Sequence, residues 1–209
     1  RFSHQDGHVR AASRFTELCE AKRFISLHFS GGTTEVLLYE NGELTIIGGT
    51  KDISFGQLLD RIGTKLGLDF PCGEELDTLA YRYLTKNVKA KILVFPKIKT
   101  NSGYINLSGI ESAVFRFIDG KTLETDEKNQ LILGIFSSIS TAILDMLDEV
   151  YKKYAINDFL FAGGVSSSKT LRKMIGEAGT NFNYVFCEPE LSSDNAIGIS
   201  LLGGEKIWR

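Results

Sequence analysis

The sequence predicts an α/β fold, in which strands and helices alternate along the chain. Two short apolar runs, at residues 24–29 and 159–161, lead into paired glycines, as strands do when they end in a tight turn. Apolar residues spaced by three or four positions, which indicate amphipathic helices, follow the second turn and fill much of the chain between the two. Alternation of strand, glycine turn and helix is typical of α/β proteins.

Helices are predicted where apolar side chains recur with the helical period. Val9 and Ala12 lie on one such face in the first segment, and residues 128–154 form the longest amphipathic segment. A Pro-Cys-Gly break separates the second and third helices. In order, the predicted helices are 4–22, 54–66, 74–84, 110–118, 128–154, 168–178 and 195–202.

Strands are predicted in the short apolar runs between these helices. The dipeptide Asn41-Gly42 is a strong hairpin signal, because both residues tolerate the left-handed backbone of a tight turn. In order, the predicted strands are 24–29, 35–39, 43–47, 92–95, 104–107, 159–161 and 184–187.

The length of 209 residues suits one large domain or two small lobes. We expect one region, 1–209, in which residues 1–70 and 155–209 form an α/β core lobe and residues 71–154 a mostly helical insertion. The chain begins with Arg1 rather than Met and opens on a histidine pair. A helix that carries ligands rarely starts a protein, so we expect a fragment or a processed product.

Composition places the chain among soluble globular proteins, with 43% hydrophobic and 24% charged residues. The formal net charge of −2 excludes a wholly basic nucleic-acid-binding protein, so any nucleic-acid contact needs a local patch. No uninterrupted apolar run reaches the roughly 18–20 residues of a membrane span, and no membrane association is expected. The 3 cysteines are widely spaced, which favours reduced thiols in the cytoplasm.

A pair of histidines, His4 and His8, is the first candidate site. One helical turn separates them, so both imidazoles can lie on one helix face and bind one divalent cation. Asp194, in a Ser-Ser-Asp-Asn segment, is a candidate third ligand, although the position also suits a helix N-cap. A solvated helix face would equally explain the histidine pair. His28 is either a further ligand or a strand histidine satisfied by hydrogen bonds.

Two glycine turns are candidates for phosphate binding. Each offers consecutive backbone N–H groups and nearby hydroxyls, and the second precedes a helix whose dipole favours an anion. Either turn alone is also explained by the need for glycine at a tight strand exit. Two turns in one chain indicate a nucleotide enzyme or a descendant of one. The candidate residues are Ser30, Gly31, Gly32 and Thr33 in the first turn and Gly163, Gly164 and Ser168 in the second.

Two further segments suggest ligand contacts. Asp60, on a predicted helix, is either an acceptor for sugar hydroxyls or a solvated acid. Residues 82–99 are rich in lysine and arginine, include aromatic residues and lack acids. This composition suits a local nucleic-acid face, and equally a solvated edge that blocks strand aggregation.

In order and spacing, these motifs resemble the TsaD family, also called Gcp or YgjD and once named O-sialoglycoprotein endopeptidase. The metal motif reads H-Q-D-G-H here against H-x-E-G-H in the family, and the phosphate turn reads F-S-G-G-T-T-E-V against V-S-G-G-H-T-x-L. A central block reads T-K-D-I-S-F-G-Q-L-L-D-R against T-x-D-D-A-A-G-E-A-F-D-K and ends in F-P-C-G against Y-P-G-G. The remaining motifs read L-S-G-I-E-S-A against F-S-G-L-K-T-A, A-G-G-V-S-S-S against G-G-V-A-A-N, and S-S-D-N-A against C-T-D-N-A.

The resemblance implies an actin-like ATPase fold of the ASKHA, ribonuclease H-like type, with a mixed sheet, flanking helices and a helical insertion, and with the N-terminal lobe absent. It implies transfer of a threonylcarbamoyl group from its adenylate to a tRNA adenosine beside the anticodon. ATP, AMP or threonylcarbamoyl-AMP would be the nucleotide ligand. tRNA would bind along residues 82–99, and TsaB-like and TsaE-like proteins would be partners.

The same resemblance assigns roles to residues. One divalent metal would be held by His4, His8 and Asp194. His28 occupies the position of a tyrosine ligand in archaeal members, and as an additional ligand it would favour iron or zinc over magnesium. Along the nucleotide, the resemblance assigns Ser30 and Gly31 to the phosphates, Asp60 and Gly73 to the ribose and Ser168 to the adenine.

Four positions depart from the family pattern. Gln57 and Ile53 replace acids, Ser168 replaces an asparagine and Glu111 replaces a lysine. These changes keep open a divergent protein that binds nucleotide or acts as a scaffold without catalysis, and a related O- or N-carbamoyltransferase. Metallopeptidase activity is not favoured, because the motif lacks the H-E-x-x-H glutamate that activates water.

Overall fold

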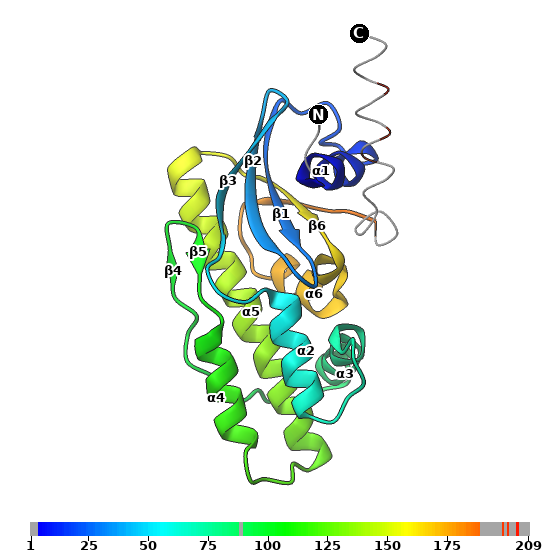
Figure 1. The fold of residues 1–209 in the computed structure, drawn as a ribbon, viewed down its shortest axis with the longest axis vertical. Helices are drawn as coiled ribbons and strands as arrows, with labels where there is room; N and C mark the ends of the chain where they lie inside the picture. The colour runs from blue at the N-terminus through cyan, green and yellow to red at the C-terminus, as the bar shows by residue number, and fades with distance from the viewer. Residues whose placement is uncertain (1–3, 88–89, 189–197, 199, 201–203, 205–209) are drawn as a thin grey trace.

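The computed structural model describes residues 4–87, 90–188, 198, 200 and 204 (Figure 1). The helices include α1 (His4–Arg14), α2 (Phe55–Lys65), α3 (Gly73–Lys86), α4 (Ser108–Ile118), α5 (Thr125–Tyr154), the 3₁₀ helix η1 (Gly164–Ser167) and α6 (Lys169–Gly176). The strands are β1 (Arg23–Phe29), β2 (Thr34–Glu40), β3 (Glu43–Thr50), β4 (Thr100–Asn101), β5 (Tyr104–Ile105), β6 (Asp158–Ala162) and β7 (Asn183–Phe186). Of the helix predicted at 195–202, Gly198 and Ser200 are described and are helical.

The strands form one mixed sheet in the order β4-β5-β3-β2-β1-β6-β7. β1, β2 and β3 make an antiparallel meander, and Asn41 and Gly42 turn between β2 and β3 with φ of 51° and 94°. β6 pairs parallel to β1, and β7 pairs parallel to β6, with helices in the connections. This mixed sheet with flanking helices confirms the α/β prediction.

The two faces of the sheet are covered by different helices (Figure 1). Side chains of β1 alternate between the faces. Ile25, Leu27 and Phe29 join the core cluster that includes α5, whereas Phe24 joins the cluster formed with α1. α1 contacts β1 and β6. His28 has the same parity as Phe24, so its side chain lies on the α1 face.

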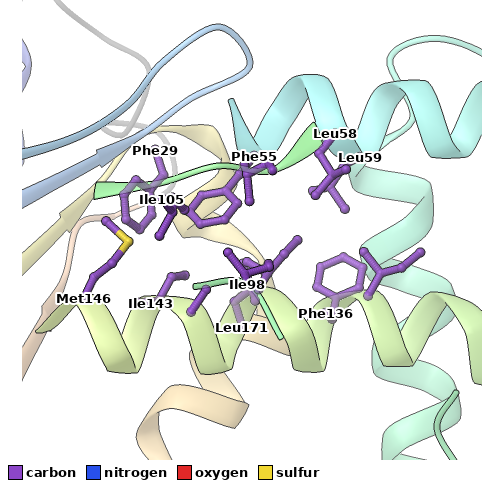
Figure 2. Packing of buried hydrophobic residues seen from close by; sticks show 14 of the residues in the cluster. Phe29, Phe55, Leu58, Leu59, Ile98, Ile105, Phe136, Ile143, Met146 and Leu171 are labelled. Atoms are coloured by element: carbon purple, nitrogen blue, oxygen red, sulfur yellow. The ribbon is translucent and has the colours of Figure 1, made fainter. Parts of the chain in front are cut away.

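α5 is the central helix of the core. Figure 2 shows its Phe136, Ile143 and Met146 facing Phe29 of β1 and Phe55 of α2. By length and composition alone, α5 could cross a membrane, because its most apolar window has a mean hydropathy of 1.6. However, 67% of that window is buried inside the structure. We therefore interpret α5 as a core helix.

The first helix is shorter than predicted. α1 ends at Arg14, whereas the apolar spacing predicted a helix over 4–22. The Thr16 hydroxyl donates to the carbonyl of Ser13 at 2.8 Å and accepts from the N–H of Leu18 at 3.2 Å. These side-chain bonds offer the backbone an alternative to further helical turns. The chain therefore turns after α1, although Leu18 still packs into the α1 cluster.

The strand predicted at 92–95 is not formed. The N–H of Leu93 donates to the carbonyl of Gln130 on α5 at 3.1 Å, so this segment pairs with a helix rather than with the sheet. Gly134 of α5 permits the contact, because a Cβ there would overlap the carbonyl of Leu93. Leu93 and Phe95 of this run pack against the core cluster instead, whereas Ile92 and Val94 are exposed.

Asp52, just after β3, joins the sheet to α4. Its carboxylate accepts the backbone N–H of Leu107 at 2.8 Å and that of Ser108 at 2.9 Å, at the N-terminus of α4. Burial disfavours the charged form, but the hydrogen bonds outweigh it and lower the pKa of Asp52 from 3.8 to about 2.

We expect Asp52→Asn to lower the free energy of unfolding at neutral pH, because it removes the charge that accepts these hydrogen bonds. The loss should be only about 1 kcal/mol, since solvent screens this exposed carboxylate. The pKa of Asp52 is lower in the folded protein than in the unfolded chain. The stabilisation is therefore complete above pH 3.8 and is lost as the pH falls toward about 2. Urea unfolding of both proteins at neutral pH and near pH 2 measures the effect. A difference that does not narrow in acid would contradict this role.

Candidate nucleotide and metal site

The two predicted phosphate turns lie at the same edge of the sheet. β1 and β6 are parallel neighbours, with His28 opposite Ala162, so both turns follow the carboxyl ends of adjacent strands. The first turn is closed by the N–H of Ser30, which donates to the carbonyl of Thr33 at 2.8 Å. The N–H of Thr33 donates in return to Ser30 Oγ at 3.0 Å. In α/β sheets this edge is where ligands bind.

The glycines of these turns differ in what requires them. Gly163 has a φ of 88°, and a Cβ there would overlap the carbonyl of Phe29, so the contact with β1 alone requires glycine. Gly31, Gly32 and Gly164 are exposed and have open space at the Cβ position. Packing therefore explains Gly163, whereas the other three leave backbone that a ligand can approach.

α2 begins against the first turn. The Ser54 hydroxyl donates to the carbonyl of Gly31 at 2.6 Å, and a Cβ on Gly56 would crowd the same residue. Ser54 Oγ also accepts the N–H of Gln57 at 3.0 Å, and the Gln57 side chain accepts the N–H of Ser54 at 3.0 Å. This capping box fixes the start of α2 against the turn.

Asp60 and Gly73, both assigned to the ribose, lie close to each other. Asp60 Oδ1 accepts the N–H of Cys72 at 2.8 Å, which fixes the chain just before α3. The Cβ position of Gly73 faces open space. Asp60 therefore has a structural role, and its contact with a sugar stays a prediction.

Asp77 is a residue that the sequence reasoning missed. Its carboxylate receives the Ser168 hydroxyl at 2.6 Å, the N–H of Lys169 at 2.9 Å and the N–H of Thr170 at 3.0 Å. It therefore caps the N-terminus of α6 from α3. Ser168 Oγ also accepts the N–H of Leu171 at 3.1 Å, so its hydroxyl hydrogen and one lone pair are already engaged.

His8 and His28 meet on the α1 face of the sheet. Their ring centroids are 4.7 Å apart, and the two residues are only 7% and 4% exposed. Two adjacent buried imidazoles fit a transition-metal ion, because imidazole nitrogen suits zinc and iron. Among the residues that the structure describes, no group of three His, Cys, Asp or Glu side chains is placed to bind one ion. The His4 side chain and Asp194 lie outside that description.

The C-terminal segment reaches α1 beside the histidine pair. A Cβ on Gly198 would overlap the carbonyl of Gly7, so the two backbones are in direct contact. Gly7 immediately precedes His8, and Gly198 follows Asp194 by four positions in the sequence. This contact brings Gly198 to the helix that carries His8.

The basic segment 82–99 is exposed at its charged side chains. Arg82, Lys86, Lys91 and Lys99 are exposed, and Lys97 forms an ion pair with Asp145 of α5 at 2.9 Å. Lys89 lies outside the described residues. Val94 in the same segment is 87% exposed. The segment therefore offers a cationic surface with some apolar area.

Three of the departures from the family pattern have partners in this structure. Gln57 completes the capping box of α2, a role for which glutamine and glutamate are both suited. Ser168 caps α6 together with Asp77. Glu111 of α4 pairs with Arg61 of α2 at 3.1 Å, so its negative charge holds two helices together. These substitutions are accommodated by the fold.

Solved structures share the fold of this chain at low sequence identity. HypF from T. kodakarensis has a TM-score of 0.72 at 13% identity, covering 98% of this chain and 36% of that chain. Component A of the (R)-2-hydroxyglutaryl-CoA dehydratase of Acidaminococcus fermentans has a TM-score of 0.63 at 20% identity, covering 100% of this chain and 70% of that chain. At these identities, the likeness shows the fold alone, and it agrees with the implied ASKHA-type lobe.

The sequence defines the family more closely. The family model of TsaD, tRNA N6-adenosine threonylcarbamoyltransferase, matches residues 2–201, and the chain belongs to this family. Proteins of that name from Streptococcus thermophilus and Streptococcus mutans are 29% and 32% identical over 208 and 202 residues. The alignments cover 95% and 93% of this chain but 58% and 57% of those relatives. The chain thus spans somewhat over half their length.

Proposed function

We propose that this protein transfers a threonylcarbamoyl group from threonylcarbamoyl-AMP to an adenosine of tRNA. Membership of the TsaD family supports this class of reaction. One structural observation carries the proposal. The two glycine turns follow the ends of the adjacent parallel strands β1 and β6, and the buried imidazole pair lies beside them. This arrangement supports a site at one edge of the sheet that would combine backbone N–H groups for phosphate with imidazole ligands for a metal.

The nucleotide would lie from the first turn toward α6. Hydrogen bonds join the first turn to α2, α2 to the start of α3, and α3 to the start of α6. The elements that carry the proposed contacts are therefore connected in this order, which supports one extended ligand. Exposed glycine backbone suits phosphate, and carboxylate suits sugar hydroxyls. The proposed contacts are Ser30, Gly31, Gly32 and Thr33 with the phosphates, Asp60 and Gly73 with the ribose, and Gly163, Gly164 and Ser168 with the adenine side.

A divalent metal, iron or zinc rather than magnesium, would be held by the histidines of α1 and β1 together with Asp194. Imidazole donors favour these ions. When bound, the ion supplies Lewis acidity toward the carbamoyl carbonyl. The chain's own contribution is to bury His8 and His28 between α1 and the sheet, which keeps bulk water from the nitrogen donors.

Calorimetric titration with AMP and ATP tests the proposal, first with zinc present and then after chelation. Binding that requires the metal is expected, and tRNA incubated with threonylcarbamoyl-AMP should then gain the modification. No nucleotide binding in either condition would contradict the proposal.

A second candidate is a nucleotide-binding protein without catalysis. It is favoured by the engagement of the Ser168 hydroxyl with Asp77, since this side chain lacks the two-pronged bond that an asparagine makes with adenine. Metal-dependent nucleotide binding without any modification of tRNA would support it.

The partners and the location are proposed on the resemblance. TsaB-like and TsaE-like proteins are the proposed protein partners, and the cytoplasm is the proposed location. The exposed lysines of segment 82–99 support tRNA as a ligand of that surface.

We expect the triple variant Lys86→Glu, Lys91→Glu, Lys99→Glu to bind tRNA at least about tenfold more weakly, because cationic contacts with phosphates dominate such affinity. The slope of log affinity against log salt should fall by roughly 2 to 3, about one for each lysine. Filter binding over a salt series measures both quantities. The matched control reverses three exposed lysines elsewhere, Lys22, Lys121 and Lys153. Equal losses in the two triple variants would reject the segment as the tRNA surface.

A further inference from the structure

Glu35 of β2 lies directly opposite His28 of β1 in the antiparallel register. Directly opposed side chains share a face of the sheet, with Cβ atoms about 4.5–5.5 Å apart. The next residues of the same parity on β2, Leu37 and Tyr39, pack with the α1 cluster, which places Glu35 on the α1 face as well. Glu35 and His28 are therefore cross-strand neighbours on that face.

A second contact ties this carboxylate to α1. Gln5 Nε2 donates to Glu35 Oε2 at 3.5 Å, and Gln5 lies between His4 and His8 in the sequence. α1 thus reaches both β1, through the ring contact of His8 with His28, and β2, through Gln5. Both Gln5 and Glu35 are half-buried. Glu35 is consequently tied to the helix that carries His8 and paired in register with His28.

Histidines that bind a metal through one ring nitrogen usually donate the N–H of the other to a carboxylate, which fixes the ring and raises its basicity. We propose that Glu35 is a positioning residue that would perform this function for His28 when a metal is bound, an inference that rests on the proposed metal site. Glu35 is not assigned as a ligand, because no three such side chains converge on one point among the described residues.

The test is titration of the protein of 209 residues with Zn²⁺ and Co²⁺, with Co²⁺ absorption as a probe of the ligand field. Glu35→Gln keeps the size and an acceptor for Gln5 but removes the charge. Its dissociation constant for Zn²⁺ is expected to rise about 10- to 100-fold, and the Co²⁺ absorption bands should shift. Glu35→Asp, which keeps the charge, should recover part of the affinity.

The matched control is Glu40→Gln, because Glu40 lies on the same strand and pairs with Arg23 at 2.8 Å, away from the imidazoles. It should bind Zn²⁺ as the unchanged protein does. Equal affinity and equal spectra in the Glu35 variants and the unchanged protein would overturn the role of Glu35 alone. Failure of the unchanged protein to bind either ion would overturn the metal site itself, and with it the role of Glu35.

Discussion

His8→Ala is expected to weaken Zn²⁺ binding by more than about 100-fold, because loss of a ligand should exceed the 10- to 100-fold cost of losing a group that only orients one. His8 is buried on α1, and its ring centroid lies 4.7 Å from that of His28, with the two rings tilted. Its removal therefore takes one of the two adjacent imidazoles from the proposed site. Under the proposed function, transfer to tRNA would be lost together with metal binding.

Zinc titration and the tRNA modification assay measure the two effects of His8→Ala. Arg14→Ala is the matched control, since Arg14 lies at the C-terminal end of the same helix, where its guanidinium contacts Cys19. Thermal melting of the metal-free variants separates loss of the ligand from loss of the fold. Unchanged zinc affinity in a folded His8→Ala protein would contradict the assignment of α1 as a metal helix.

Asp77→Ala is expected to lower the free energy of unfolding by about 3 kcal/mol, because it removes a charged acceptor of three hydrogen bonds at the start of α6. The two helices α3 and α6 would lose these three bonds and keep the one that the Thr170 hydroxyl donates to the backbone carbonyl of residue 77. For a protein of this length, the melting temperature should fall by roughly 6–12 °C.

Differential scanning calorimetry of Asp77→Ala measures this loss. Glu75→Ala is the matched control, because Glu75 is an exposed acid in the first turn of the same helix. That change should cost less than about 1 kcal/mol, the usual limit for a charge near a helix dipole. Equal losses in the two variants would show that the bonds to α6 contribute nothing particular.

The same carboxylate bears on how a nucleotide can lie. The N-terminus of α6 was predicted as an anion site, yet the structure fills it with the negative charge of Asp77. A phosphate there would meet a like charge at close range. The first turn, with exposed backbone at Gly31 and Gly32, has no such charge among its described contacts. We therefore expect the phosphates at that end only.

The sequence could predict those parts that depend on local pattern. The hairpin at Asn41-Gly42, the buried strands and the long α5 follow from spacing and turn chemistry, and all are present. The strand at 92–95 could not be rejected, since its pairing with α5 depends on Gly134, which is distant in sequence. The bond that the Ser168 hydroxyl donates to Asp77 could not be predicted from local sequence either, because it joins residues 91 positions apart.

For the site, residue types indicated the chemistry but not the competing structural roles. Gly163 was assigned to a ligand, whereas the contact with Phe29 already requires it. Asp60 was assigned to a sugar, and one of its oxygens holds the N–H of Cys72. A motif identifies the residue type at a position. Only the structure shows which of its hydrogen-bonding groups are already engaged by other residues and which a ligand could still use.

α5 determines how the protein unfolds. Its buried apolar side chains, from Leu131 to Val150, belong to one core cluster with residues of β1, α2 and α4. Residues 71–154, which were expected to form an insertion, therefore cannot unfold by themselves without exposing the face of the sheet that packs against α5. Amide protons of α5 and of β1 should exchange with solvent at a common slow rate, set by opening of the whole molecule. Unfolding would then be one cooperative event rather than two.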